Sequence, residues 1–321
     1  MGIVALFVWF VVLVTAGGLF IAYVRGEPIR LEPRNKAVLI TGCDTGFGHA
    51  LAATLDDIGF NVFAGCLDSR GDGARKLQEG ASSRLLVVQM DVSKDEGVQA
   101  ALATVKQNLP EPKRGLWGIV NNAGLSTFGE VEWCNIDVYE RTAQVNLFGS
   151  IRVTKAFLPL VRRAKGRVVT ITSGIARQAI PSRSVYVTSK YAMEGFCQCL
   201  RYEMKRWGVH VSIIEPGNFV AATGIFTKEN IQRIGDKMWE AMPEEVRQDY
   251  GRDDFDKKVA TMAYYSNIGT RDKTPVIDSF VGALLDKYPK IRYEPKDWYW
   301  HMRTFIMTHL PAVIGDNIYI Y

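Results

Sequence analysis

The sequence contains no run of five basic residues, although its formal net charge is +5. Lys and Arg are scattered along the 321 residues, so the clustered positive charge typical of nucleic-acid-binding proteins is missing. Internal repeats and low-complexity segments are also missing. With 47% hydrophobic and 23% charged residues, the composition is that of a globular protein able to bury a substantial core. The sequence therefore predicts no nucleic-acid partner.

The five cysteines lack the spacing of a zinc site or of a redox-active pair. Their number is odd, and two of them stand two residues apart in a probable helix, where they point away from each other. This pattern fits a reduced compartment best, with the thiols serving as small apolar side chains. No metal site is predicted. The cysteines are Cys43, Cys66, Cys134, Cys197 and Cys199.

One long apolar run, IVALFVWFVVLVTAGGLFIAYV at residues 3–24, carries no charged side chain. As a helix it would span about 33 Å, enough to cross a hydrocarbon core of about 30 Å. A cleaved signal peptide would have a shorter apolar region preceded by a basic residue, whereas here the basic residues follow the run. We therefore expect residues 1–24 to form a single-pass transmembrane anchor and the proline-containing residues 25–35 to form a linker.

From residue 36 onward, short apolar runs alternate with segments compatible with helices. The runs have little polar alternation, which is typical of parallel strands covered on both faces. We therefore predict an α/β fold with a doubly wound parallel sheet, whose ligands gather at the carboxyl ends of the strands. The amphipathic residues 228–259 predict a helical cover on the substrate side, around 216–270, within one domain that spans 36–321. The expected strands are 36–40, 61–65, 85–90, 116–121, 166–172 and 209–215, and the expected helices are 48–57, 95–108, 137–162 and 188–206.

The segment TGCDTGFG, residues 41–48, follows the first expected strand and opens the first expected helix. Its glycines, Gly42, Gly46 and Gly48, lack Cβ atoms and permit a tight turn. Backbone N–H groups can then approach a pyrophosphate at the amino end of a helix. An ordinary turn between a strand and a helix is the alternative. The strand and helix on either side favour a dinucleotide site.

A second motif, SRSVYVTSKYA at residues 182–192, separates Tyr186 from Lys190 by four residues. On a helix, side chains at this spacing share a face, about 6 Å apart at their Cβ atoms. An ammonium next to a phenol favours the phenolate form, which would let Tyr186 exchange a proton near neutral pH. Taken alone, the pair is more typical of a helix with one buried aromatic residue and one solvated lysine.

Together, TGxxxGxG, NNAG at residues 121–124, Asn146, Ser173 and the Tyr186/Lys190 pair resemble the short-chain dehydrogenase/reductase family, over residues 36 to about 220. The resemblance implies a Rossmann-type fold and a hydride transfer between a secondary alcohol and a nicotinamide. It also implies that Tyr186 exchanges the proton with the substrate oxygen and that Lys190 binds the nicotinamide ribose. Ser173 would hold the substrate oxygen, and Asn146 would support Lys190 in a proton relay.

The resemblance further implies which residues bind the cofactor and favours NAD over NADP. Asp68 follows the second expected strand, where an acidic residue would bind the adenosine ribose, and Asp44 would repel an additional phosphate. Arg70 is the one basic residue nearby that favours NADP. Asp91 matches the adenine contact of the family. The implied cofactor-binding residues are Gly42, Asp44, Gly46, Phe47, Gly48, Asp68, Asp91, Asn122, Tyr186 and Lys190.

Within the family, segments such as GLWGIVNNAG, EPGNF and MTHLP resemble the branch of D-β-hydroxybutyrate dehydrogenases. This resemblance implies D-3-hydroxybutyrate and acetoacetate as substrates. Arg177 and Arg183 border the expected active site, and a guanidinium fork suits a carboxylate. Both arginines could instead be solvated loop residues. The alternatives are the neighbouring branch of membrane-bound retinol and 17β-hydroxysteroid dehydrogenases, which share an N-terminal anchor, and a catalytically silent membrane scaffold of the same fold.

The last residues, DWYWHMRTFIMTHLPAVIGDNIYIY at 297–321, are rich in Trp, Tyr, Met and Ile. Trp and Tyr are frequent at membrane interfaces, so this segment is a candidate for contact with membrane lipid or with another subunit, although an ordinary core segment would look similar. With the predicted anchor, it favours a location at the endoplasmic reticulum membrane or a mitochondrial membrane. A homo-oligomer is also expected.

Overall fold

The computed structural model describes residues 9, 12, 15, 17, 28–266 and 268–321. Most of the predicted anchor and the first part of the linker lie outside these residues, so the single-pass anchor stays a prediction. Among the helices that are described, none is both long enough and apolar enough to cross a bilayer.

A sheet of seven strands forms the centre of the molecule, in the order β3-β2-β1-β4-β5-β6-β7, and every neighbouring pair is parallel. The α/β fold with a parallel sheet is therefore confirmed. Six strands fall within a residue or two of the expected apolar runs, whereas β7 is too short to be visible as a pattern. The strands are β1 Ala37–Thr41, β2 Asn61–Cys66, β3 Leu85–Gln89, β4 Gly118–Asn121, β5 Arg167–Ile171, β6 His210–Ile214 and β7 Arg292–Tyr293.

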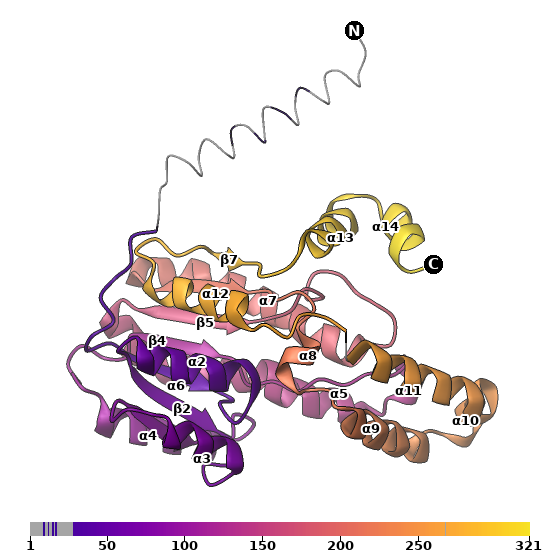
Figure 1. Ribbon diagram of the computed structural model, residues 1–321, viewed down its shortest axis with the longest axis horizontal. Helices are drawn as coiled ribbons and strands as arrows, with labels where there is room; N and C mark the ends of the chain where they lie inside the picture. The colour runs from indigo at the N-terminus through magenta and orange to yellow at the C-terminus, as the bar shows by residue number, and fades with distance from the viewer. Residues whose placement is uncertain (1–8, 10–11, 13–14, 16, 18–27, 267) are drawn as a thin grey trace.

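Helices cover both faces of this sheet (Figure 1). One buried core joins α2 Gly46–Asp57, α3 Asp72–Glu79 and α12 Thr274–Leu285 to one face. The other core joins α4 Asp95–Asn108, α6 Ser150–Ala164 and α7 Ser184–Met204 to the opposite face. Because side chains alternate along a strand, neighbours such as Leu39 and Ile40 belong to different cores.

Beyond the carboxyl ends of the strands lie α9, α10 and α11, toward which the strand arrows point in Figure 1. These helices occupy Lys228–Ala241, Glu244–Tyr250 and Arg252–Ser266, and a short helix α8, Val220–Thr223, precedes them. A third core, which includes Trp133 and Phe255, holds them against the segment after β4. The segment predicted as a cover is thus helical, and its role toward substrate stays a prediction.

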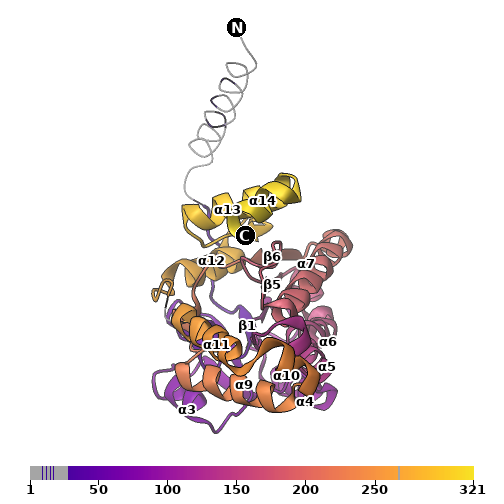
Figure 2. The same cartoon turned by 90° about the vertical axis from the view of Figure 1, so that its right-hand side faces the viewer.

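The chain ends in two helices, α13 Trp298–His309 and α14 Ala312–Tyr319, which Figures 1 and 2 both place beyond β7 and α12. Several of their large apolar side chains are exposed. Three more elements are not visible as patterns in the sequence: η1 Val131–Trp133, η2 Gln144–Gly149 and η3 Lys205–Trp207.

The expected single helix over 137–162 is in fact two helices joined by a π-helical turn. Helix α5, Ile136–Ala143, passes through η2 into α6. A π turn inserts one residue into the helical repeat while the chain stays helical on both sides of it, so the sequence of this segment reads as one long helix. Such turns are frequent at functional sites, and this one contains Asn146.

Candidate active site

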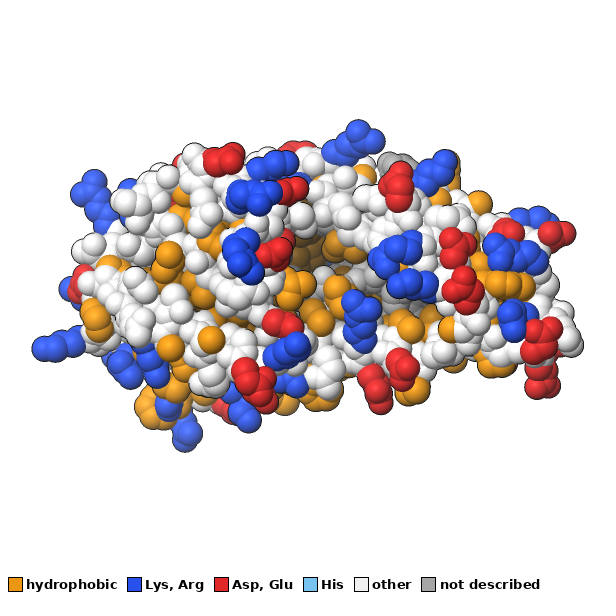
Figure 3. Space-filling view, turned by 90° about the horizontal axis from the view of Figure 1, so that it is seen from below, with side chains coloured by type: hydrophobic (Ala, Val, Ile, Leu, Met, Phe, Trp, Pro, Cys, Tyr) orange, Lys and Arg blue, Asp and Glu red, His pale blue; other side chains and the backbone are white. Residues whose placement is uncertain are grey.

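A cleft of about 2110 Å³ opens at the carboxyl ends of the strands. It is bounded by the glycine turn after β1, the loop after β5, the start of α7 and the helices α11 and α13. Figure 3 shows the cleft as a hollow with hydrophobic side chains inside it and Lys or Arg side chains on both sides. All four residues predicted as catalytic come from elements that meet here.

The glycine turn requires two of its three glycines for conformation and the third for space. Gly42 and Gly46 have φ angles of 70° and 68°, a left-handed region that side chains with a Cβ disfavour. A Cβ atom on Gly48 would lie only 2.3 Å from the carbonyl oxygen of Gly42. Asn122 holds the turn from β4, because its Nδ2 donates to the carbonyl oxygens of Thr41 and Gly42 at 2.9 and 3.1 Å. The amino end of α2 therefore presents a backbone cradle that fits a pyrophosphate.

At the far end of this cradle, Asp44 occupies the backbone N–H groups that follow β2. Its carboxylate accepts hydrogen bonds from the N–H groups of Leu67 and Asp68 at 3.0 and 3.1 Å. Asp68 therefore lies close to a second carboxylate. Cys66, which ends β2, is buried, and this burial together with the charges of Asp44 and Asp68 raises the pKa of its thiol to about 12. The thiol is protonated at neutral pH, and this end of the cleft carries negative charge.

Asp91 lies on the same side of the cleft, after β3. Burial opposes ionisation of Asp91, but hydrogen bonds from the hydroxyl and N–H of Ser93 outweigh it and hold the pKa of the carboxyl below its usual value. Phe47 lines the cleft from the first turn of α2 and packs edge-to-face against Phe219. Eight residues of the predicted cofactor set line the cleft, and Gly48 and Asp68 do not; cofactor binding by the set stays a prediction.

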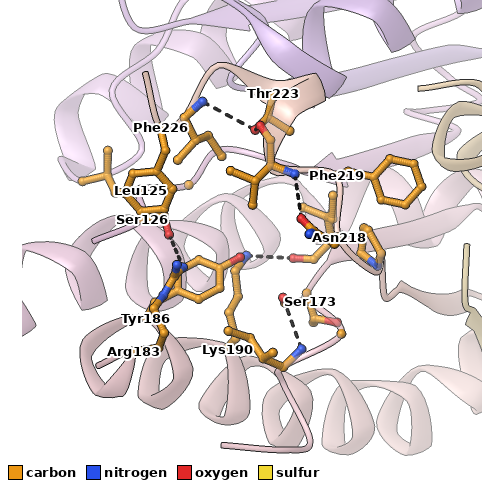
Figure 4. A pocket seen from close by; sticks show the side chains of 18 of the residues that line it. Leu125, Ser126, Ser173, Arg183, Tyr186, Lys190, Asn218, Phe219, Thr223 and Phe226 are labelled. Atoms are coloured by element: carbon orange, nitrogen blue, oxygen red, sulfur yellow. Dashed lines mark hydrogen bonds between the residues drawn. The ribbon is translucent and has the colours of Figure 1, made fainter. Parts of the chain in front are cut away.

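Tyr186 and Lys190 lie one turn apart on α7, as their spacing predicts. The Lys190 Nζ atom is 5.6 Å from the centre of the Tyr186 ring and donates to the carbonyl oxygen of Ile171 at 3.1 Å. Ser173 follows β5 in the adjacent loop. Figure 4 shows Ser173, Tyr186 and Lys190 converging on the same part of the cleft. An ammonium, a phenol and a hydroxyl at one point can hold an oxygen atom and exchange its proton.

Asn146 connects this group to the π turn. Its Nδ2 donates to the hydroxyl of Ser189 at 3.0 Å and to the carbonyl oxygen of Leu125 at 2.9 Å, while its Oδ1 accepts from the N–H of Leu125 at 2.7 Å. The Ser189 hydroxyl in turn donates to the carbonyl oxygen of Tyr186. Asn146 is therefore fixed by hydrogen bonds to both the loop after β4 and helix α7.

Arg183, three residues before Tyr186, carries a charge that no described carboxylate neutralises. Its guanidinium lies 5.2 Å from the centre of the Tyr186 ring and 5.1 Å from that of Phe226. The Nη2 atom donates to the hydroxyl of Ser126 at 2.8 Å, and the buried Nε atom has no hydrogen-bond partner among the described residues. Burial lowers the pKa of the Arg183 guanidinium, and the nearby Tyr186 raises it by a smaller amount. Figure 4 shows the guanidinium beside Tyr186 and Ser126 at the cleft.

Arg177, the other predicted substrate residue, has very different surroundings. Its guanidinium donates to the carboxylate of Glu215 from Nε at 3.0 Å and from Nη2 at 3.1 Å, and Nη2 also reaches Glu294 at 2.8 Å. Binding of a substrate carboxylate by Arg177 stays a prediction, and this charge is already matched within the protein.

The sequence motifs missed several residues that shape the cleft. Ser126 and Phe226 orient Arg183, and Trp300 lines the cleft from α13. These residues belong to segments far apart in the chain and follow no motif. One signal was present for Glu215, since it is a carboxylate at the end of a strand in which Val211, Ile213 and Ile214 are buried.

Comparison with known proteins gives matches over most of the chain. Residues 36–233 match the short chain dehydrogenase family. The mitochondrial D-beta-hydroxybutyrate dehydrogenase of Bos taurus is 53% identical over 290 residues, which are 89% of this chain and 84% of that protein. The 17-beta-hydroxysteroid dehydrogenase type 6 of Mus musculus is 38% identical and covers 97% of this chain and 96% of its own length.

Among solved structures, a short chain dehydrogenase from Burkholderia cenocepacia in complex with NADP shares the fold. It superposes with a TM-score of 0.66 over 91% of this chain and 100% of its own, at 18% sequence identity. At that identity, the likeness concerns the fold alone.

Proposed function

Because the chain belongs to the short-chain dehydrogenase family and acts on CH–OH groups, we propose that it oxidises the hydroxyl of a short 3-hydroxy acid, D-3-hydroxybutyrate, to the ketone, and catalyses the reverse reduction. The observation that carries this proposal is Arg183. Its charge is partly buried within one helical turn of Tyr186 and has no acidic partner among the described residues. A substrate carboxylate would supply that partner.

The energetics favour an anionic substrate over a neutral one. Removing an ion from water costs several kcal/mol unless it is paired, and a guanidinium–carboxylate fork is among the strongest pairs that a protein forms. The Arg183 guanidinium lies over the rings of both Tyr186 and Phe226, and these two contacts fix its plane in the absence of a ligand. Retinol and the 17β-hydroxysteroids have no carboxylate and would leave Arg183 unpaired in a largely apolar cleft. The sequence similarity to D-beta-hydroxybutyrate dehydrogenase supports the same choice.

A nicotinamide held in the cleft would supply the acceptor for the hydride that leaves the carbinol carbon. Ser173 donates a hydrogen bond to the substrate oxygen and holds it beside the phenol. Tyr186 takes up the hydroxyl proton as the hydride leaves. Lys190 stabilises the charge of the phenolate and, with Asn146, positions the proton relay. Arg183 fixes the carboxylate and so orients the carbinol carbon.

We further propose NAD as the cofactor. The N–H groups of Leu67 and Asp68 would be the natural partners for an additional phosphate on the adenosine ribose, and the Asp44 carboxylate already occupies them. Asp68 adds a second negative charge, so a phosphate there would be repelled. The ratio of kcat/KM with NAD to that with NADP tests this choice, and a ratio below one would contradict it.

The location is proposed on the sequence and on the relatives. The apolar residues 3–24 support a membrane anchor, and the word "mitochondrial" in the name of the Bos taurus relative favours a mitochondrial membrane over the endoplasmic reticulum. The exposed apolar side chains of α13 and α14 would then face lipid or another copy of the chain. Release of the full-length chain from membranes by alkaline carbonate would contradict the anchor.

The substrate is tested by Arg183→Leu, assayed with D-3-hydroxybutyrate and with a neutral secondary alcohol of similar size. Loss of a desolvated charge pair costs about 2–5 kcal/mol, so kcat/KM for the acid should fall roughly 30- to 5000-fold, mainly through KM. Turnover of the neutral alcohol should change little. Arg141→Leu, which removes an exposed arginine from the rim of the same cleft, serves as the control.

Two outcomes would contradict the proposal. If Arg183→Leu lowers both activities equally, the arginine is structural and the carboxylate argument fails. If the unaltered chain ignores hydroxybutyrate but oxidises a steroid or a retinoid, the neighbouring branch of the family is the correct assignment.

A further inference from the structure

The loop that carries Ser173 is attached to the end of β6 on both sides of that residue. The N–H of Thr172 donates to the carbonyl oxygen of Ile214 at 2.8 Å, and the N–H of Gly174 donates to that of Pro216 at 2.6 Å. These two hydrogen bonds continue the β5–β6 register, in which Ile171 pairs with Ile214, so Thr172 lies beside Glu215 and Ser173 lies beside the next residue, Pro216. Glu215 is a fully buried carboxylate, with 0% of its surface exposed.

Arg177 closes the loop from its other end. After Ser173 the chain turns through a hydrogen bond from the Ala176 N–H to the Ser173 carbonyl oxygen at 2.9 Å. Arg177 then reaches back to the Glu215 carboxylate with Nε and Nη2 at 3.0 and 3.1 Å, a two-point contact. The turn from Ser173 to Arg177 is thus tied to Glu215 by a fork that resists rotation about either side chain.

Four more charged residues surround this fork and complete what we call the Glu215 cluster. The Lys296 side chain, also fully buried, contacts Glu215 at 3.2 Å and Glu294 at 2.8 Å. Arg292 of β7 contacts both Glu215 and Glu194, and Glu194 accepts a hydrogen bond from the hydroxyl of Thr172 at 2.8 Å. The cluster holds equal numbers of positive and negative groups: Arg177, Arg292, Lys296, Glu194, Glu215 and Glu294.

We propose that Arg177 is a positioning residue for Ser173, acting through its fork to Glu215, and not a ligand of the substrate carboxylate. The guanidinium is already matched by two carboxylates, so it offers no unpaired charge to an anion. Its removal would free the turn that holds the Ser173 hydroxyl. This inference requires only the oxidation of an alcohol, which the family supplies, and is independent of the proposed acid substrate.

The expected effect lies in the chemical step. A displacement of about 1 Å in a group that orients the reacting atoms costs on the order of 100-fold in rate. In the proposed mechanism Ser173 would contact the reacting oxygen of any alcohol substrate, whereas a carboxylate ligand would matter only for an acid. A positioning role therefore predicts a loss in kcat that does not depend on the substrate.

The test compares Arg177→Met with the unaltered full-length chain on two substrates, D-3-hydroxybutyrate and a neutral secondary alcohol that the chain oxidises. We expect kcat, normalised to the number of NADH-binding sites, to fall about 10- to 100-fold for both, while each KM stays within about threefold. Arg177→Lys keeps the charge but not the two-point contact with Glu215, so its kcat should lie between those of Arg177→Met and the unaltered chain. Glu294→Gln removes a charge from the same cluster but leaves the fork intact, so its kcat should stay near that of the unaltered chain.

Other outcomes would overturn the inference. A steep rise in KM for the acid alone, with kcat unchanged, would make Arg177 a carboxylate ligand. Unchanged kcat on both substrates would show that the fork does not position Ser173. An equal loss in Arg177→Met and Glu294→Gln would show that the cluster acts only on overall stability. If Arg177→Met fails to fold, Arg177→Lys against Glu294→Gln gives the same comparison.

Discussion

Two arginines stand six positions apart in the loop that joins β5 to α7, and the surroundings of their charges are opposite. Arg177 belongs to the Glu215 cluster, in which Glu215 and Glu294 neutralise its charge. Arg183 faces the cleft beside Tyr186, Phe226 and Ser126, and no carboxylate of the described residues forms an ion pair with it. A charge matched inside the protein fixes structure. A charge left unmatched beside a reactive group is available to a ligand.

The difference also separates rigidity from specificity. The Glu215 cluster joins the segments after β5 and β6 to β7 and α7 through several charge-assisted hydrogen bonds, which resist movement of the loop that carries Ser173. The cleft side relies on ring stacking and on one hydrogen bond to a neutral hydroxyl, which orient the guanidinium without using up its charge. The first arrangement suits a group that must not move, and the second suits a group that must bind.

The largest effect should come from Tyr186, whose ring lies next to the Arg183 guanidinium. Tyr186→Phe removes the proton-transferring oxygen and leaves both guanidinium groups in place. Turnover should fall at least about 100-fold, because loss of general acid–base catalysis usually costs that much. NADH binding, measured by fluorescence titration, should be retained. Activity within about tenfold of the unaltered chain would show that Tyr186 is not the residue that exchanges the proton.

A smaller effect is expected from Ser126→Ala, which tests how the orientation of Arg183 affects substrate binding. The change deletes the acceptor of the Arg183 Nη2 hydrogen bond but keeps the charge. Since such a bond contributes about 0.5–1.5 kcal/mol, KM for hydroxybutyrate should rise about 3- to 10-fold, with kcat unchanged. Steady-state kinetics on the acid and on a neutral alcohol check this. A loss confined to kcat would mean that Ser126 does not act through Arg183.

The smallest effect concerns the pH dependence of stability and tests the Glu215 cluster. Burial opposes ionisation of Glu294, but the hydrogen bond and charge of Lys296, together with Arg177, hold the pKa of its carboxyl below its usual value. Because the folded state lowers this pKa, the resulting stability is present above the unfolded pKa of about 4.3 and is lost as pH falls through the folded value.

The unaltered chain should therefore unfold at a higher temperature than Glu294→Gln at pH 7, and the difference should shrink below about pH 4. Thermal unfolding followed from pH 7 to pH 3 measures it. If the difference in unfolding temperature stays constant over this range, the ionised form of Glu294 does not stabilise the Glu215 cluster.

Much of the fold and of the reacting group could be predicted from the sequence, since both depend on local spacing. Apolar runs marked six strands, and the four-residue spacing of Tyr186 and Lys190 placed them on one face of α7. The glycine turn was equally local, because the positive φ angles of Gly42 and Gly46 follow from residue type and position between a strand and a helix. The π turn at Asn146 was not predictable, because it preserves the helical pattern on both sides.

The environment of each arginine was decided only by the tertiary structure. From the sequence, Arg177 and Arg183 were equivalent candidates for a carboxylate. Arg177 meets Glu215 across 38 residues and Glu294 across 117, so no local pattern could show that its charge is matched. Arg183 is stacked against Phe226, which arrives from the segment after α8. The charge on an arginine is fixed by its residue type, but the pairing of that charge depends on which distant strands and helices the packing of the sheet brings beside it.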